Sequence, residues 1–448
     1  MDQASRSELP VVTISSRGAD RLRAGHVWVY RSDVLDAAGI DPGALVLVKE
    51  RAHGAPDRRA SRALANKKIH AAPILGSAFY STASEIAIRM ISRRAVEDLE
   101  QLVRERIRAA VAYRERFVRN TNAYRVVFSE GDFLPGLIVD RYNDVLSLQV
   151  LAQAMDSEPM RRVLLSELQQ RLAPLAIVER VDSRVRKLEQ LPEKQSAVIW
   201  NHSSASAALS PAKGEEPATS GRKPDPSASE IPVAPHLGTE IQMNGVRFTH
   251  DPLAGQKTGS FLDQRENYAA AENYARGAAL DVFTYQGGFA LHLARVCDRV
   301  TGVDSSRPAL EAAEANALLN GHDIEWIEAN AFDLLRDYSA AGAQYDTIVL
   351  DPPAFAKSRQ NRETAIRGYK ELNLRALKML RPGGVLITCS CSYHVSAADL
   401  IEVVSSAAQD SHRIIRILEN RGQSKDHPSV LGIPETSYLK CLISVVSY

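Results

Sequence analysis

The most regular pattern of hydrophobic and polar positions begins at residue 236 and continues to the C-terminus. Short apolar runs alternate there with segments of helical period. The runs are "ALDVF", "RVTGVD", "IEWIEA", "DTIVLD" and "GVLITCS", and the helical segments are "FALHLARVC", "RPALEAAEANALLNG", "AFDLLRDY" and "GYKELNLRALKML". Such alternation with short connections predicts a doubly wound, mainly parallel sheet with helices on both faces. We therefore expect a Rossmann-like α/β domain over residues 236–448, with its ligand beyond the C-terminal ends of the strands.

The pattern of the N-terminal part differs, because its apolar runs are short and are separated by Gly, Pro and Asp. Runs such as "VVTI", "VWVY", "ALVLV" and "IAIRMI" predict a small β-rich domain over residues 8–94. A basic insert, residues 52–70, interrupts this domain. The stretch from Arg51 to His70 holds six Lys or Arg residues and one Asp. A disordered surface insertion is the favoured interpretation, and a basic arm that contacts phosphates is the alternative.

A small α+β domain is predicted in the centre of the chain, over residues 95–200. We expect one charged amphipathic helix over residues 96–119 and a second helix over 157–172. The stretch between them, "YRVVFSEGDFLPGLIVDRYNDVLSLQV", contains two or three strands, with turns at "EGD", "LPG" and "YND". Residues 201–235 are rich in Ser, Ala and Pro, so we expect a disordered linker or insert there.

Composition and charge narrow the class of protein. The 448 residues, 45% of them hydrophobic, are enough for two or three globular domains. No apolar run approaches the roughly 18 residues of a membrane span, and four cysteines are no disulfide framework, so we expect a cytoplasmic protein. The net charge is +1, but residues 1–125 hold 22 Lys or Arg and 14 Asp or Glu. This basic third is consistent with an anionic partner such as nucleic acid, and equally with a solvated basic face.

The first strand of the C-terminal domain ends in "DVFTYQGGFA". Gly287 and Gly288 allow a tight turn and a close approach of a ligand, although a plain turn would also use them. Asp281 begins this stretch, and Asp304 ends the next strand, where a carboxylate can accept hydrogen bonds from ribose hydroxyls. The G-x-G-x-x-G phosphate fingerprint of dinucleotide dehydrogenases is missing. A nucleoside without phosphates, S-adenosylmethionine, therefore suits the site better than NAD.

The fourth strand ends in "LDPPAFAKS", which is rich in groups that can hold a planar base. Asp351 lies at the strand tip, and Pro352 and Pro353 stiffen the loop and leave carbonyls free, because Pro has no N–H. Phe355 offers an aromatic face, and Lys357 follows in the same loop. A carboxylate, carbonyls and a stacking ring together predict a pocket for a base that presents hydrogen-bond donors.

Taken in order, the motifs resemble the class I S-adenosylmethionine-dependent methyltransferases of the large-subunit rRNA cytosine-C5 type. They are "GQKTGSFLDQREN", "LDVFTYQGGFALHLA", "VDSSRPALEAAEANALLNG", "DPPAFAKS" and "CSCSYHV". "RLRAGHVWVY" and "LGSAFYSTASEIAIRMISR" resemble the PUA domain of that family, and "GDFLPGLIVDRY" resembles its central domain. The resemblance covers nearly the whole chain except the inserts 52–70 and 195–235. It implies an enzyme that forms 5-methylcytosine in large-subunit rRNA, uses S-adenosylmethionine and no metal ion, and grips RNA with its PUA and central domains.

The resemblance also implies the residues of the site. The cofactor-binding candidates are Phe261, Asp263, Arg265, Asp281, Phe283, Thr284, Tyr285, Gly287, Gly288, Asp304, Ser305, Asn330, Ala331, Phe332 and Asp351. The substrate-binding candidates are Pro352, Pro353, Phe355 and Lys357. The chain departs from the family at Asn330, where Asp is more usual, and in having two cysteines where relatives often have one. Whether the chain forms a homodimer stays open.

Two of the four cysteines, Cys389 and Cys391, follow the apolar run "GGVLIT". Because C5 of cytosine is a poor nucleophile, methylation there requires prior addition of a thiolate at C6 and a carboxylic acid to support charge at N3. The tips of the fourth and fifth strands are neighbours in this fold, so Asp351 and these cysteines should lie together. Cys391 is the favoured nucleophile, because Cys389 continues the strand and should be buried, and the family's cysteine within "SCS" aligns with Cys391.

The same residues allow other interpretations. Cys389, Cys391 and His394 could suggest zinc, but no second pair stands nearby in the sequence, and residues two apart do not suit a disulfide. An enzyme that methylates an exocyclic amine of adenine or guanine would use "DPPAF" without a thiol. A non-catalytic RNA-binding assembly factor could keep the same fold, although the cofactor turn argues against it.

Overall fold

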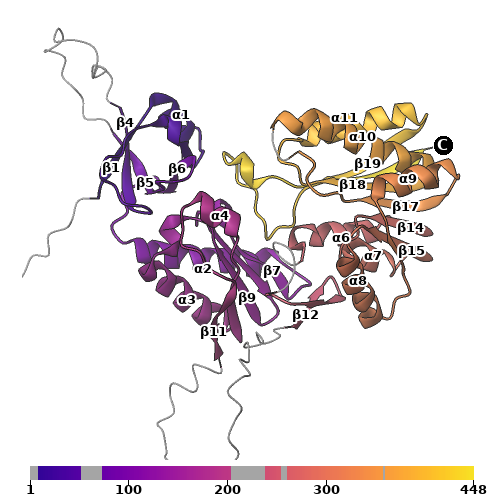
Figure 1. Cartoon of the computed structure of the whole chain (residues 1–448), viewed down its shortest axis with the longest axis horizontal. Coiled ribbons are helices and arrows are strands. Elements are labelled where there is room, and N and C mark those ends of the chain that lie inside the picture. The colour runs from indigo at the N-terminus through magenta and orange to yellow at the C-terminus, as the bar shows by residue number, and fades with distance from the viewer. Residues whose placement is uncertain (1–8, 52–72, 203–237, 254–259, 357–358, 448) are drawn as a thin grey trace, which may run out of the picture.

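The structure, a computed structural model, describes residues 9–51, 73–202, 238–253, 260–356 and 359–447. Three units follow one another along the chain and lie side by side, with the central unit between the other two (Figure 1). The insert 52–70 and nearly all of the linker 201–235 fall outside the described residues, as does Lys357. Within the described residues, the helices are all too short or too polar to span a membrane.

The N-terminal unit is built on a six-stranded sheet with the order β2-β6-β5-β4-β1-β3. In the strand Leu45–Glu50, half-buried and buried positions alternate, so every second side chain packs into the core. The core includes Val12, Ile14, Val46 and Ile88. Its elements are β1 (Val11–Ile14), α1 (Ser16–Arg23), β2 (Trp28–Tyr30), β3 (Val34–Asp36), β4 (Leu45–Glu50), β5 (Ile74–Tyr80) and β6 (Ile86–Ser92).

The central unit is a five-stranded sheet with the order β11-β10-β9-β8-β7. Two helices share one apolar core with it, and they contribute residues such as Val103 and Ile107 of α2 and Leu164 and Leu168 of α3. The elements are α2 (Leu99–Phe117), β7 (Ala123–Phe128), β8 (Leu137–Tyr142), β9 (Val145–Val150), α3 (Glu158–Leu172), β10 (Ala176–Glu179), α4 (Ser183–Leu188) and β11 (Ala197–Asn201).

The C-terminal unit is a seven-stranded sheet with the order β16-β15-β14-β17-β18-β20-β19. Five strands from β16 to β18 are parallel, and β20 inserts antiparallel between β18 and β19. The strands are β14 (Ala278–Val282), β15 (Arg299–Asp304), β16 (Glu325–Glu328), β17 (Tyr345–Leu350), β18 (Leu380–Ser390), β19 (Ile414–Arg421) and β20 (Lys440–Ser447).

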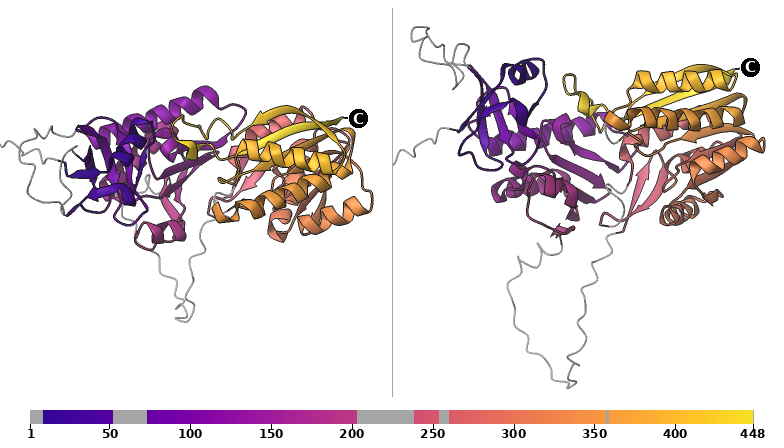
Figure 2. Two further views of the ribbon diagram at one scale, coloured as in Figure 1. Left: turned by 90° about the horizontal axis from the view of Figure 1, so that it is seen from above. Right: turned by 45° about the horizontal axis from the view of Figure 1, so that its top comes forward.

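Helices cover both faces of this sheet (Figure 2). One apolar core joins it to α6, α7 and α8, and a second joins it to α9, α10 and α11. The helices are α6 (Arg265–Glu272), α7 (Gly288–Leu293), α8 (Arg307–Asn320), α9 (Ala331–Ala340), α10 (Arg362–Met379) and α11 (Ala397–Asp410). The hairpin β12 (Thr239–Met243) and β13 (Val246–His250) links this unit to the central one.

The segment between β19 and β20, residues 422–439, extends back towards the other two units (yellow in Figure 1). Asp426 is fully buried there and binds residues of the central unit and of its own unit. Its Oδ2 accepts a hydrogen bond of 2.9 Å from the Arg125 amide of β7, and its Oδ1 lies 3.2 Å from the Arg265 guanidinium of α6. Arg114 of α2 donates to the Asp426 carbonyl at 2.7 Å. Residues 422–439 therefore hold the C-terminal and central units in a fixed relation.

Candidate active site

Asp281 shapes the turn that follows β14. The carboxylate is fully buried, and its Oδ2 accepts hydrogen bonds from the Thr284 hydroxyl at 2.6 Å and the Ala290 amide at 2.9 Å. Burial raises the pKa of Asp281 to about 7. Its Oδ1 has no hydrogen-bond partner among the described residues. Asp281 thus braces the turn from within, and its second oxygen is an acceptor that a donor from outside could satisfy.

The backbone of the same turn is strained. Phe283 and Tyr285 have φ angles of 68° and 50°, although neither is a glycine. Such conformations cost about 1–3 kcal/mol each and persist where the surroundings over-determine them, often at ligand sites. The surroundings here are hydrogen bonds of 2.9 Å from the amides of Phe283 and Thr284 to the Val303 carbonyl of β15. The turn geometry is therefore imposed by the neighbouring strand.

The two glycines of the turn have different reasons to be glycine. Gly287 has a φ of 85°, in the left-handed region. Gly288 lies against Tyr268 of α6, and a Cβ built on it would come within 2.5 Å of the tyrosine hydroxyl. The close approach expected from a ligand at Gly288 is thus made by a side chain of the protein itself.

Asp304 ends β15 with a carboxylate in a fixed position. Its Oδ2 accepts from the Tyr285 amide and its Oδ1 from the Ser306 amide, both at 2.9 Å. The side chain is half-buried, and Ser305 beside it is exposed. Each carboxylate oxygen keeps a lone pair after these bonds, so Asp304 can still accept from a diol.

Asn330, Ala331 and Phe332 begin α9 at the tip of the third strand. Asn330 is the N-cap, and its Oδ1 accepts from the Phe332 amide at 2.9 Å and the Asp333 amide at 3.4 Å. The capping need explains an Asn at this position without reference to a ligand. The Ala331 side chain is buried in the core, whereas the Phe332 ring is 36% exposed.

The residues at this edge fit S-adenosylmethionine. That molecule presents an ammonium group and two ribose hydroxyls as donors and an adenine ring as a flat apolar face. The edge supplies the carboxylates of Asp281 and Asp304 as acceptors. It also supplies two exposed aromatic rings, Phe332 and Phe261; the latter is 49% exposed and packs edge-on to Tyr285 at 5.2 Å. The donors of S-adenosylmethionine would thus find acceptors at this edge, and its adenine ring would find aromatic surface.

Two residues that we expected to contact the cofactor, Arg265 and Asp263, form contacts within the protein. The Arg265 guanidinium is buried, bound to Asp426 and held by the Ala123 carbonyl, so its observed contacts are with the protein, and a contact with the cofactor stays a prediction. Asp263 accepts a hydrogen bond of 2.6 Å from the Tyr438 hydroxyl, which joins the turn before α6 to the segment before β20. The negative charge of Asp263 also helps to raise the pKa of Asp351 and the pKa of Cys391.

Asp351 lies one residue beyond β17, at the tip of the sheet. Its Oδ2 accepts a hydrogen bond of 2.9 Å from the side-chain amide of Gln264. Burial, together with the nearby charges of Asp263 and Asp281, raises the pKa of Asp351 to about 8. Asp351 is consequently a carboxylic acid that holds its proton at neutral pH, which suits a hydrogen-bond or proton donor.

The two cysteines of "TCSCS" lie in different environments. Cys389 is the penultimate residue of β18, is fully buried, and stands directly opposite Cys441 of β20. Cys391 follows the end of the strand and is only partly buried. Burial, with the charges of Asp351 and Asp263, raises the pKa of Cys391 to about 11. Of the two thiols, Cys391 is the one that a substrate could reach.

A buried lysine lies close to Cys391. Lys440 begins β20, is only 8% exposed, and donates to the carbonyls of Ser392 at 2.7 Å and Tyr438 at 2.8 Å. Burial lowers the pKa of Lys440 to about 8, while the neighbouring Cys391 and Asp399 act in the opposite direction. Its positive charge favours the thiolate form of Cys391. Sequence analysis missed Lys440, although a lysine at the start of the apolar run "KCLISVV" is an unusual choice.

Tyr369 of α10 holds the turn that carries Cys391. Its hydroxyl is bonded to the hydroxyls of Ser390 and Ser392, both at 2.9 Å, so the residues on either side of Cys391 have a common anchor. The Ser392 hydroxyl also accepts from the Ala356 amide at 3.3 Å, which ties the turn to the "DPPAF" loop. Tyr369 and Gln264 were not expected from the sequence, because their partners lie far away along the chain.

The predicted base-binding loop is only partly open to a substrate. Pro352 is buried and Pro353 is exposed. Phe355 is half-buried between Phe332, at 5.9 Å between ring centroids, and Tyr369, at 4.9 Å. Phe355 thus packs the loop against α9 and α10, and Lys357 lies outside the described residues.

A cavity of about 600 Å³ opens beside the Cys391 turn. Tyr393 and His394 line it from the turn, and Arg362 and Glu363 line it from the start of α10. Tyr393 is 51% exposed, so it offers an aromatic surface two residues from the thiol. His427, by contrast, is buried beside Asp426, 3.4 Å from it, and has no access to this cavity.

Comparisons with known proteins agree with this arrangement. The profile of an S-adenosylmethionine-dependent methyltransferase family matches residues 177–437, and that of a PUA-like domain matches residues 12–54. "Ribosomal RNA large subunit methyltransferase I" from Shewanella denitrificans is 33% identical over 95% of this chain and 96% of that protein. The protein of the same name from Tolumonas auensis is 37% identical over 81% and 85% of the two chains. Among solved structures, "SMU.776, a putative methyltransferase complexed with SAH" superimposes with a TM-score of 0.73, covers 98% of this chain and all of the other, and shares 18% identity.

Proposed function

We propose that this chain, which belongs to the S-adenosylmethionine-dependent methyltransferase family, methylates C5 of a cytosine in large-subunit rRNA. The relatives named as large-subunit rRNA methyltransferases support the class of substrate. The observation that carries the position of methylation is the accessible thiol of Cys391 beside Asp351, an acid that keeps its proton at neutral pH. S-adenosylmethionine is the cofactor and supplies an electrophilic methyl group.

Cys391 is the proposed nucleophile. Its thiolate adds to C6 of the cytosine, which makes C5 an enamine-like carbon that is able to accept a methyl group. After transfer, loss of the C5 proton to a base lets the sulfur leave C6 with its electron pair. The turn anchored by Ser390 and Ser392 holds the thiol in position for both steps.

Asp351 is the proposed acid. As sulfur adds to C6, negative charge develops on the cytosine ring, and a proton delivered to N3 neutralises it. Asp351 has this proton at neutral pH because burial raises its pKa to about 8. The protonated form also carries no negative charge to oppose ionisation of Cys391. One protonation state of Asp351 therefore serves both the ring and the thiol.

Lys440 completes the electrostatics of the site. Its ammonium group, bound to the Ser392 carbonyl, favours the Cys391 thiolate and so opposes part of the effect of burial, which still raises the pKa of the thiol to about 11. Lys440 acts as a positioning and electrostatic residue, since its hydrogen bonds go to backbone carbonyls.

Methylation of an exocyclic amine is the alternative that "DPPAF" keeps open, because it needs no thiol. RNA that carries 5-fluorocytidine separates the two mechanisms, since fluorine at C5 cannot leave as a proton and the Cys–C6 adduct persists. We expect the wild type and Cys389→Ala to be trapped covalently, and Cys391→Ala to remain free while it still binds the cofactor. A Cys391→Ala enzyme that methylates RNA at nearly the wild-type rate would instead establish amine methylation.

The target is identified by mapping modified nucleotides. Mass spectrometry of large-subunit rRNA from a strain lacking this gene should show loss of one 5-methylcytosine, restored by the wild type and not by Cys391→Ala. An unchanged set of methylated nucleotides would reject rRNA as the substrate and favour the non-catalytic role.

A further inference from the structure

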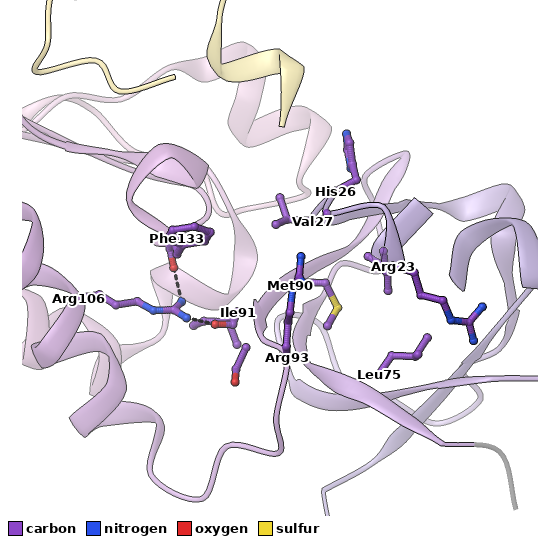
Figure 3. A pocket seen from close by; sticks show the side chains of 12 residues that line it. Arg23, His26, Val27, Leu75, Met90, Ile91, Arg93, Arg106 and Phe133 are labelled. Carbon is purple, nitrogen blue, oxygen red and sulfur yellow. Dashed lines mark hydrogen bonds between the residues drawn. The ribbon is translucent and has the colours of Figure 1, made fainter. Parts of the chain in front are cut away.

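A cavity of about 420 Å³ lies between the N-terminal and central units (Figure 3), and its lining includes no residue of the Cys391 turn. Val27, Leu75 and Met90 line it from the N-terminal unit. Arg106 of α2 and Phe133, which follows β7, line it from the central unit. The wall from the N-terminal unit is largely apolar but also includes Arg23, His26 and Arg93, and the wall from the central unit combines a guanidinium with an aromatic ring.

Arg106 is a cation without an acidic partner. Its guanidinium donates to the carbonyls of Ile91 and Phe133 and bridges the two units (Figure 3). Burial lowers the pKa of Arg106 to about 10. No carboxylate of the described chain lies within ion-pair distance of it, although most buried charges in proteins are paired. A half-buried cation without an acidic partner at a cavity wall is complementary to an anion.

A second unpaired cation stands at the same cavity. Arg93, just after β6, is exposed and makes no ion pair within the described ranges, whereas Arg23 is already bound to Glu50 and Asp20. Beside these cations, the Phe133 ring is 45% exposed and lies 5.8 Å from the Arg106 guanidinium. The cavity therefore offers two positive charges and one accessible aromatic face.

We propose that this interdomain cavity binds one unstacked nucleotide of the RNA, outside the active site. Arg93 and Arg106 take its phosphate, and its base lies against Phe133 and the Met90 side of the wall. The volume is in the range of small-ligand pockets, roughly 300–1,000 Å³, and single-stranded RNA is recognised by stacking on aromatic rings with phosphates on arginines. This inference rests on the proposed function only in taking RNA as the substrate.

The cavity is joined to the active site by contacts across the interface. His26, which also lines it, lies 3.1 Å from the carboxylate of Glu435, and the Tyr393 hydroxyl donates to the same carboxylate at 3.4 Å. Tyr393 is two residues from Cys391. His26 of the cavity and Tyr393 of the Cys391 turn are therefore linked through Glu435. We infer that one RNA molecule occupies the cavity and the active site together.

The test measures binding of a large-subunit rRNA fragment to the full-length enzyme by fluorescence anisotropy over a range of salt concentrations. We expect Phe133→Ala to weaken binding about 5- to 100-fold, the usual loss for one stacked base, with little change in salt dependence. Arg93→Ala should weaken binding and reduce the slope of log K against log salt by about 1, as expected for one lost phosphate contact. Arg94→Ala is the matched control, because this neighbour is exposed and does not line the cavity.

A second measurement identifies the site directly. RNA containing 4-thiouridine is cross-linked to the wild type, and the attached peptide is found by mass spectrometry. Cross-links to the segments around Met90 or Phe133 support the proposal. Wild-type affinity in both Phe133→Ala and Arg93→Ala, or equal losses in Arg93→Ala and Arg94→Ala with none in Phe133→Ala, overturns it. Either result leaves the 5-fluorocytidine trap unaffected, so the failure of this inference and that of the proposed function are distinguishable.

Discussion

The side-chain amide of Gln264 donates a hydrogen bond of 2.9 Å to Oδ2 of Asp351. Gln264 cannot turn away, because its own carbonyl oxygen accepts from Asn267 at 2.7 Å. The amide N–H groups thus always face the carboxyl group, where they favour its charged form. Asp351 holds its proton in spite of this donor, because burial and neighbouring acids outweigh it.

The first prediction concerns this hydrogen bond. Gln264→Met removes the donor while nearly keeping the side-chain volume, so the pKa of Asp351 should rise above its present value of about 8. The alkaline limb of kcat/KM, where Asp351 loses its proton, should move upward by about half to one pH unit, equivalent to about 1 kcal/mol. Methylation rates from pH 6 to 10 measure this shift. A limb that stays in place would show that Asp351 is not the acid.

The second prediction concerns the charge of Lys440. Lys440→Met should slow alkylation of Cys391 by iodoacetamide at pH 7, because a cation no longer favours the thiolate. The difference from the wild type should shrink as the pH rises through about 8, since Lys440 then loses its own charge. Alkylation at Cys391 is followed by mass spectrometry, with the exposed Lys425→Met as the control. A difference that is constant with pH would indicate a purely structural lysine.

The third prediction concerns the cofactor. Asp304→Ala should weaken binding of S-adenosylmethionine by about 1–3 kcal/mol, the usual loss for a hydrogen bond to a charged group. The exposed acid Asp323→Ala, at the start of the neighbouring strand, should bind normally. Calorimetric titration measures both. Equal affinities in the two variants would remove Asp304 from the cofactor site.

The fourth prediction concerns Asp426, which joins two units. Burial alone would raise the pKa of this carboxylate, but His427, Arg265 and the Arg125 amide lower it to about 2. The contribution to stability is therefore complete above the unfolded-state pKa of about 4 and is lost as the pH falls from about 4 to 2.

Asp426→Ala removes this contribution at every pH. It leaves the buried Arg265 guanidinium with Glu266, at 3.6 Å, as its remaining acidic partner, so we expect a loss of about 3 kcal/mol, the lower end for a broken buried ion pair. Thermal unfolding at pH 7 and at pH 3 measures the effect, and the gap between variant and wild type should narrow at the lower pH. A gap that stays constant would mean that Asp426 acts through packing and not through its charge.

The sequence predicts the layers of the C-terminal domain and which of the cysteines Cys389 and Cys391 is buried. The Rossmann-like α/β class with an N-terminal PUA-like domain is confirmed, because strand and helix periods are local properties of the sequence. Cys389 is buried and Cys391 is only partly buried, because the strand predicted from the apolar run ends at Ser390, between them. What the sequence could not show are contacts between distant segments. Arg265 looks like a cofactor ligand within "LDQREN", but Asp426 lies 161 positions further on and binds it.

The position of Asp426 has a consequence for synthesis of the protein. The residue lies 301 positions after Arg125 of β7, whose amide donates to its carboxylate. Domains fold as units during translation, N-terminal ones first, so the N-terminal and central units can form while the rest of the chain is still being made. The contacts of Asp426 with the central unit can form only after residues 422–439 have left the ribosome, later than those of the hairpin β12–β13. A chain released before that point would keep the folded N-terminal and central units but lack the contacts of Asp426 that help to align the central unit with Cys391.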